Sequence, residues 1–211
     1  MKTGLALAAL WFSLTACGGD PGDDVANDPN QPSGGGNAMP TEAPIPDGLV
    51  RTVNLITVMD IGTPELCLGA VAESYPPQCG GPEITNWDWD VHGQGMFEQQ
   101  GDVRWGTYVV TGHWDGTSFE VTEAIPGALY DPMVPEPTPT PTPTVHYSDK
   151  ALEEIAHELL ELPGVQGAYG GEGSNGHVLV DVTYDDGTLQ DWVDAEYGEG
   201  VVIVSSALVD V

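Results

Sequence analysis

The sequence predicts two small folded domains, the first all-β and the second α+β. Residues 49–131 contain short β-branched and aromatic runs bounded by Gly, Pro and Asp, with no helical period. Residues 148–211 combine an amphipathic helical stretch with β-type runs. Residues 132–147 carry the Thr-Pro repeat MVPEPTPTPTPTV, which is typical of an extended polyproline II spacer. This linker therefore marks the boundary between the two domains.

The first domain begins with β-type runs separated by loops. A strand is expected over Val50 to Met59, because it is rich in β-branched residues and stops at the turn signal from Asp60 to Pro64. The run from Asn86 to Asp90 alternates tryptophan and aspartate, so on a strand both tryptophans would share one face.

A β-hairpin is expected in the second half of this domain. The run from Val103 to Trp114 reaches the turn signal Asp115-Gly116, and residues 117–122 return. Short strands with internal glycines predict a small barrel or sandwich. The phrase Gly106 to Gly112, followed by Trp114-Asp115-Gly116, is similar to the central hairpin of secreted OB-like barrels, and this similarity implies an OB-like barrel.

The second domain begins with a helix. Ser148 is expected to cap it, and Pro163-Gly164 ends it. Its apolar residues recur at helical spacing and leave the glutamates on the other side: Leu152, Ile155, Ala156, Leu159 and Leu160. We therefore expect one amphipathic helix.

The rest of the second domain predicts the order αββαβ. Strands are expected over Val165 to Tyr169 and Val178 to Tyr184, and a final buried strand over Val201 to Leu208. A helix through Tyr197 lies between the last two strands. Thr188 caps it, with Asp191 completing a capping box, and Gly198 stops it. Both helices should lie on one face of a three-stranded sheet, with a right-handed crossover. This order is similar to that of small open-faced protease propeptides and secreted adaptors.

Three cysteines divide into Cys17 and the pair Cys67 and Cys79. The pair lies in a loop that contains two prolines and ends at Gly80-Gly81-Pro82. A disulfide there would constrain the unfolded chain by roughly 3 kcal/mol. The alternative, a metal site, lacks further thiols or nearby histidines.

The N-terminal segment has the features of a secretory signal. Lys2 precedes an apolar run that ends at Leu14-Thr15-Ala16-Cys17, and this motif resembles the lipobox of bacterial lipoproteins. The resemblance implies that residues 1–16 are a signal peptide and that Cys17 is acylated, with palmitate or a similar chain. The alternative, a membrane-spanning helix, needs a run of roughly 17–25 residues, and this one is shorter. Residues 17–48 are then expected to be a disordered, acidic Gly/Pro tether.

A wider resemblance supports the same location. The segments CLGAVAESYPPQCGGPE, WDWD and RWGTYVVTG together look like a module of uncharacterised actinobacterial lipoproteins. It implies an exported protein and supplies no activity.

The charge of the chain excludes two classes of partner. Thirty-three acidic and 4 basic residues give a formal charge of −29. Binding to nucleic acid or to anionic lipid headgroups needs clustered Lys or Arg, which the chain lacks. The acidic bias fits attraction to cations, basic proteins or cell-wall amines, and a salt-adapted organism would show the same bias.

No motif predicts catalysis, a cofactor or a metal. The five histidines, at positions 92, 113, 146, 157 and 177, do not fall at a metal-binding spacing. Gly173-Ser174-Asn175-Gly176 resembles a nucleophile elbow, but it lies between two expected strands rather than before a helix. The aspartates do not form a calcium-binding loop.

Aromatic residues form the one candidate binding site. Five are concentrated in the first domain: Trp87, Trp89, Trp105, Tyr108 and Trp114. They could fill the core, or one or two could line a groove that binds sugar rings or a partner's side chains. With Asp88, Asp90 or Asp115 at its rim, such a groove would favour a neutral sugar or a cationic group.

These observations favour a non-catalytic binding or accessory protein. It would be lipid-anchored at the cell membrane on the extracytoplasmic side, with a cell-wall glycan or a basic protein as candidate partner. The alternative is a hydrolase that acts on envelope material.

Overall fold

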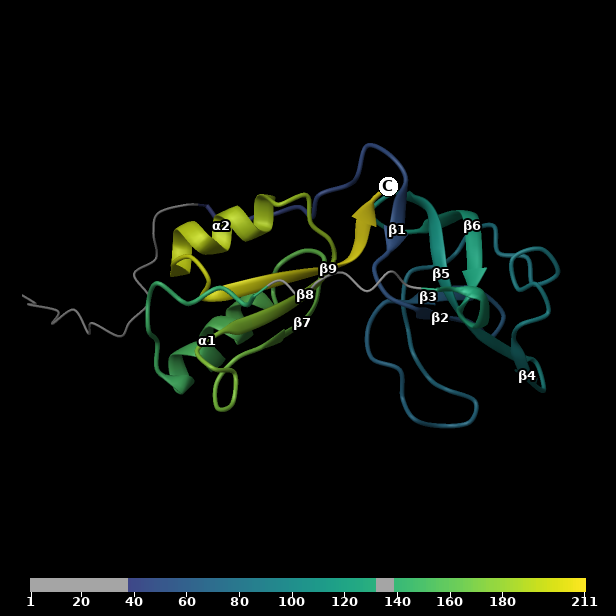
Figure 1. Ribbon diagram of the computed structural model, residues 1–211, viewed down its shortest axis with the longest axis horizontal. Coiled ribbons are helices and arrows are strands. Elements are labelled where there is room, and N and C mark those ends of the chain that lie inside the picture. The colour runs from purple at the N-terminus through teal and green to yellow at the C-terminus, as the bar shows by residue number, and fades with distance from the viewer. Residues whose placement is uncertain (1–37, 132–138) are drawn as a thin grey trace, which may run out of the picture.

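A computed structural model describes residues 38–131 and 139–211, so the expected signal peptide and Cys17 lie outside the described residues. Nine strands form one sheet in the order β3-β2-β5-β1-β9-β8-β7, with β4 and β6 also paired to β5. Figure 1 shows a β-rich part at one end and a part with two helices at the other, with β9 running between them. The predicted combination of a β-rich part and a small α+β part is confirmed.

The β-rich part is built around one long strand. β5 (Val103–Trp114) pairs with β1 (Val50–Thr52), β2 (Ile56–Asp60), β4 (Glu98–Gln100) and β6 (Phe119–Pro126). β3 (Pro64–Cys67) pairs with β2, and the short 3-10 helix η1 (Gly127–Leu129) follows β6. The sheet curls around a core of apolar side chains that includes Val58, Leu66, Ile84, Tyr108 and Phe119.

The predicted β5–β6 hairpin is confirmed. Trp114 pairs with Phe119, and the turn between them contains Gly116 at φ +92°, a conformation that favours glycine. The Asp115 carboxylate accepts hydrogen bonds from the backbone N–H groups of Thr117 and Ser118, at 2.8 and 2.7 Å. Both residues of the Asp-Gly pair therefore stabilise the turn, Asp115 through its hydrogen bonds and Gly116 through its positive φ.

Two strand predictions in this part are wrong. The run from Val50 to Met59 is two strands, because β1 turns toward β9 while β2 pairs with β3. The run from Asn86 to Asp90 is a turn and loop, in which the Asp88 carboxylate accepts from the Asp90 N–H at 2.9 Å. Local side-chain hydrogen bonds of this kind compete with strand pairing.

The predicted disulfide is present between Cys67 and Cys79. It closes the loop that follows β3. The far end of this loop returns to β3, since the Leu66 N–H donates to the Pro82 carbonyl at 2.9 Å and Glu65 bridges to Glu83.

The α+β part contains α1 (Asp149–Leu159), β7 (Val165–Tyr169), β8 (Val178–Tyr184), α2 (Thr188–Tyr197) and β9 (Val202–Asp210). β8 pairs with β7 in the antiparallel and with β9 in the parallel direction. The apolar residues of both helices share one core with alternate residues of β8: Val178, Val180 and Val182. Ser148 caps α1 as predicted, since its hydroxyl accepts from the Ala151 N–H at 3.3 Å.

The predicted cap of α2 is wrong. Thr188 is the first helical residue, and Gly187 occupies the cap position at φ +100°. Asp185 accepts hydrogen bonds from the N–H groups of Leu189 and Gln190, at 3.0 and 3.3 Å. This carboxylate, which precedes the predicted cap, therefore supplies the acceptors at the start of the helix. Gly198 ends α2 at φ +103°, as expected.

β1 and β9 join the two parts. They pair in the antiparallel direction from Val50–Asp210 to Thr52–Leu208. Leu208 and Tyr184, which belong to the α+β part in sequence, are buried in the core of the β-rich part. The sequence predicts two domains on either side of the Thr-Pro linker, but the two parts contact each other directly through this strand pairing and this shared core.

The described residues of the Thr-Pro linker also pack against the fold. The Thr144 N–H and hydroxyl both donate to the Glu199 carbonyl, at 2.9 and 3.0 Å. The Tyr147 hydroxyl donates to the Tyr197 carbonyl at 3.1 Å. Residues 144–147 are thus held at the carboxyl end of α2.

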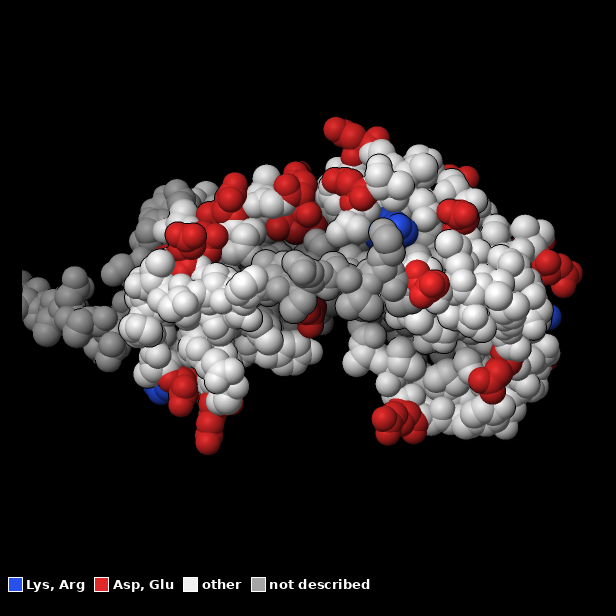
Figure 2. Space-filling view, viewed as in Figure 1, with Lys and Arg blue, Asp and Glu red and all other residues white. Residues whose placement is uncertain are grey.

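Acidic side chains are spread over the surface. Figure 2 shows them scattered on both parts rather than gathered in one patch, with few basic residues among them. Within residues 38–131 and 139–211, no helix is long and apolar enough to span a membrane.

Candidate functional site

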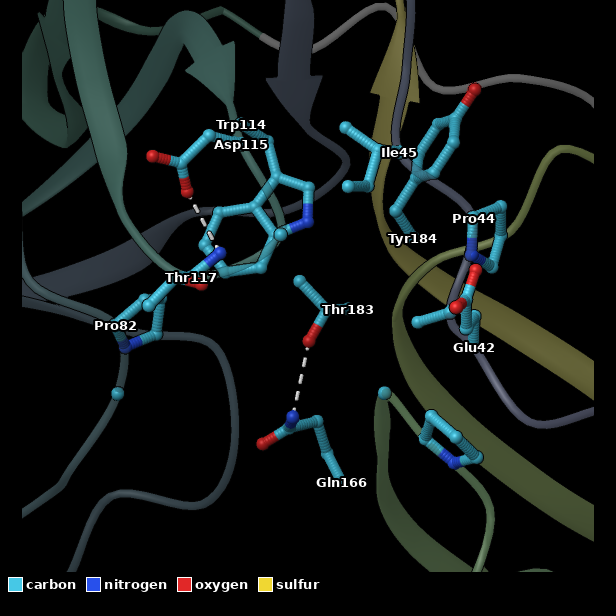
Figure 3. A pocket seen from close by; sticks show the side chains of 15 residues that line it. Glu42, Pro44, Ile45, Pro82, Trp114, Asp115, Thr117, Gln166, Thr183 and Tyr184 are labelled. Atoms are coloured by element: carbon cyan, nitrogen blue, oxygen red, sulfur yellow. Dashed lines mark hydrogen bonds between the residues drawn. The ribbon is translucent and has the colours of Figure 1, made fainter.

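A cleft of about 710 Å³ lies at the junction of the two parts. We call it the junction cleft. Its walls come from four regions: residues 42–45, the loop at Gly81-Pro82, the turn after β5, and the neighbouring ends of β7 and β8. Figure 3 shows that the side chains of both parts face the same space. The cleft therefore exists only because β1 and β9 hold the parts together.

Trp114 is the largest side chain in the junction cleft. It is the last residue of β5, and its ring packs partly against the core of the β-rich part. In Figure 3 the indole lies between Asp115 and Thr183. One part of the ring is thus supported by the core while another part remains available to a ligand.

Asp115 places a negative charge beside Trp114. Its carboxylate accepts from the Ser118 hydroxyl at 2.9 Å, in addition to the two backbone N–H groups of the turn. These hydrogen bonds, led by those from Ser118 and Thr117, hold the pKa of Asp115 below its usual value. The group stays ionised at neutral pH, so it suits accepting hydrogen bonds or facing a cation rather than donating a proton.

The opposite wall is polar and belongs to the α+β part. The Gln166 side-chain amide donates to the Thr183 hydroxyl at 3.0 Å, and both side chains line the cleft (Figure 3). Tyr184 follows Thr183, and its hydroxyl donates to the Asp210 carboxylate at 3.0 Å. Burial and the neighbouring Asp210 raise the pKa of Tyr184 to about 12, so its hydroxyl stays protonated.

The chain that precedes β1 closes one side of the cleft. A Cβ atom on Gly164 would lie 2.9 Å from the Ala43 side chain, and one on Gly116 would lie 3.0 Å from that of Ile45. Residues 43–45 therefore contact both parts, although they belong to the expected tether.

The five predicted aromatic residues do not form one site. Trp89, Trp105 and Tyr108 are buried, and Trp87 is half-buried against the same core. Trp87 and Trp89 contact each other edge to face, with ring centroids 5.3 Å apart. Among them only Trp114 lines the junction cleft.

Two of the buried aromatic residues donate hydrogen bonds from their polar atoms, which allows them to be buried in the core. The Trp89 indole N–H donates to the Asp60 carboxylate at 2.8 Å. The Tyr108 hydroxyl donates to the Met96 carbonyl at 3.0 Å, and burial raises its pKa to about 12. These contacts fit core packing for both residues.

Trp105 lies beside a second cavity, of about 530 Å³, at the far end of the β-rich part. Its lining is mainly apolar and includes Leu55, Met96 and Phe97. Trp105 itself is 7% exposed, and Tyr75 covers it edge-on at a centroid distance of 5.2 Å. Little of this indole is available to a ligand.

The predicted acidic rim is present only in part. Asp115 lines the junction cleft, whereas Asp88 and Asp90 lie in the loop around Trp89 and do not line it. Sequence reasoning missed Glu42, Gln166 and Thr183, which do. No local signal could have found them, because they meet Trp114 only through the pairing of β1 with β9.

No family model, no curated protein and no solved structure matches this chain. Within the described residues, no group of three or more His, Cys, Asp or Glu side chains is placed to hold a metal ion. The case for a function therefore depends on the geometry of the junction cleft.

Proposed function

We propose that this protein is a lipid-anchored, extracytoplasmic binding protein without a catalytic role of its own. Cys17 would carry the anchor, as the lipobox motif suggests. The Cys67–Cys79 disulfide supports an oxidising compartment, since such bonds persist mainly outside the cytoplasm. Kinship with exported lipoproteins and an OB-like origin of the β-rich part belong to the same proposal, and both are supported by sequence resemblance.

The anchor is tested by replacing Cys17 with serine. A serine cannot form the thioether, so palmitate labelling should be lost and the protein should leave the membrane fraction or stay uncleaved. Cys67→Ser is the matched control and should keep its label. Labelling that persists in Cys17→Ser would refute the anchor.

The junction cleft is the proposed binding site, and one observation supports this assignment. A half-buried tryptophan faces a cavity whose lining combines the carboxylates of Asp115 and Glu42 with uncharged polar and apolar groups. No Lys or Arg is among the residues that the structure places around it. An aromatic surface with acidic neighbours favours a neutral sugar or a cationic group over a phosphate-bearing ligand.

Replacing Trp114 with alanine tests this site. We expect about a tenfold loss of affinity, which corresponds to about 1.4 kcal/mol, because the aromatic contact surface is removed. The probes are tri-N-acetylglucosamine and a short lysine-rich peptide, each titrated by calorimetry.

The matched control for Trp114→Ala is Tyr75→Ala. Tyr75 is an exposed aromatic residue, 67% accessible, and it does not line the junction cleft. Its loss should leave affinity unchanged. Equal affinity of the wild type and Trp114→Ala for a probe that binds would place the site elsewhere.

A further inference from the structure

A third cavity, of about 390 Å³, continues the junction cleft along the sheet. We call it the sheet groove. Gln166 lines both cavities, so they meet at this side chain. The sheet groove lies between β7, β8 and β9 on one side and Leu68 to Ala70 of the disulfide loop on the other. Figure 2 shows the surface hollowed between the two parts.

The sheet groove uses the sheet face that no helix covers. Val178, Val180 and Val182 point into the core beneath the helices, whereas Leu179 and Asp181 between them are exposed. Alternate residues of a strand point to opposite faces, so Asp181 and Thr183 share the open face. The Gln166 amide reaches Thr183 on that face.

Tyr169 forms an aromatic platform at the far end of the sheet groove. It is the last residue of β7, is 62% exposed, and lines this groove. A Cβ atom on Gly167 would lie 2.8 Å from the Tyr169 hydroxyl oxygen and 3.1 Å from ring atom Cε2. The ring therefore folds back along the strand over Gly167, where the missing side chain leaves room for it.

The two aromatic surfaces lie on either side of Gln166. Pro163 and Gly164, which precede β7, line the junction cleft with Trp114, and Tyr169 at the end of β7 lines the sheet groove. The distance along the strand from Gln166 to Tyr169 is already roughly 10 Å, and Trp114 lies on the other side of Gln166. A single sugar ring cannot contact both Trp114 and Tyr169, whereas a chain of sugars can.

The lining of the sheet groove favours a neutral chain. Its polar residues are mostly amides and hydroxyls, with Asp181 as the one carboxylate: Asn54, Gln166, Tyr169, Ser205 and Ser206. Such groups exchange hydrogen bonds with sugar hydroxyls, and an aromatic face accepts the weakly positive C–H groups of a sugar ring. A basic peptide would need more carboxylates along the path to pair its charges.

We propose that the junction cleft and the sheet groove together bind one extended neutral glycan chain, with Trp114 and Tyr169 as its two stacking positions. This inference rests on the proposed binding role of the junction cleft. It adds the class of ligand and a second contact point on the α+β part.

The test measures affinity against chain length with N-acetylglucosamine oligomers. The wild type should bind the hexamer about tenfold more tightly than the dimer, because only the hexamer spans both rings. Tyr169→Ala should reduce this ratio to about twofold or less without changing dimer affinity. Tyr169→Phe keeps the ring and should retain the ratio, which separates stacking from loss of the hydroxyl.

Each other outcome overturns a definite statement. Equal affinity of the wild type for dimer and hexamer, with binding still dependent on Trp114, refutes the extended site and leaves the junction cleft standing. Binding of the lysine-rich peptide alone identifies a basic peptide as the ligand and refutes the glycan. A Tyr169→Ala variant that keeps the wild-type ratio refutes the platform. Failure of all these probes to bind at millimolar concentration overturns both proposals.

Discussion

Replacing Leu208 with alanine should lower the free energy of unfolding by about 2–5 kcal/mol, the range for removing a fully buried leucine side chain. Leu208 is 0% exposed and lies in the core of the β-rich part, with Val50 and Tyr184. It comes from β9, the last strand of the chain. A residue near the carboxyl terminus is thus expected to stabilise a part that begins at residue 50.

Two signals can follow the two parts during denaturation of Leu208→Ala. The clustered rings of Trp87, Trp89 and Tyr108 report on the β-rich part by near-ultraviolet circular dichroism. The two helices lie in the α+β part and report by far-ultraviolet circular dichroism. Because the sheet is continuous, we expect both midpoints to fall together.

The neighbouring Val209 supplies the control for Leu208→Ala. It is 37% exposed and pairs with Arg51 through the same strand. Val209→Ala should change stability by less than about 0.5 kcal/mol. A Leu208→Ala variant that shifts only the helix signal would show that the parts unfold independently.

Reducing the Cys67–Cys79 disulfide should cost roughly 3 kcal/mol of stability, because the bond closes a loop and restricts the unfolded chain. Guanidinium unfolding with and without reductant measures the effect. A variant with both cysteines replaced by alanine should have the unfolding midpoint of the reduced protein, and adding reductant should not change that midpoint. An unchanged midpoint on complete reduction would contradict this expectation.

The same loop contributes to both cavities. Gly81-Pro82 lines the junction cleft, and residues 68–70 line the sheet groove. We therefore expect reduction to weaken ligand binding as well as stability. The β1–β9 pairing also predicts that the helices of the α+β part lose stability on reduction.

Local patterns predicted the elements whose partners lie nearby. The Asp115-Gly116 hairpin, the Ser148 cap and the pairing of Cys67 with Cys79 all depend on residues within a short stretch, and the structure contains each. The alternation of tryptophan and aspartate wrongly suggested a strand. The Asp88 carboxylate accepts a hydrogen bond from the nearby backbone N–H of Asp90, which therefore does not pair with a neighbouring strand.

The contact between the two parts could not be predicted from local patterns. β1 pairs with β9 across about 160 residues, and the sequence of neither strand indicates which strand it pairs with. Trp114 was among the predicted site residues, but the sequence could not separate it from Trp89 or Tyr108. Their burial is decided by tertiary contacts, such as the hydrogen bond from Trp89 to Asp60.

The most direct test of a binding site at the junction is a heteronuclear nuclear magnetic resonance titration of the ¹⁵N-labelled protein with tri-N-acetylglucosamine. We expect the indole N–H signal of Trp114 and the side-chain amide signals of Gln166 to shift together, because these groups line one cavity from opposite parts. The Trp105 indole, beside the distant cavity, serves as the internal control. Shifts confined to Trp105, or bound ligand that leaves both Trp114 and Gln166 unmoved, would contradict a binding site between the two parts.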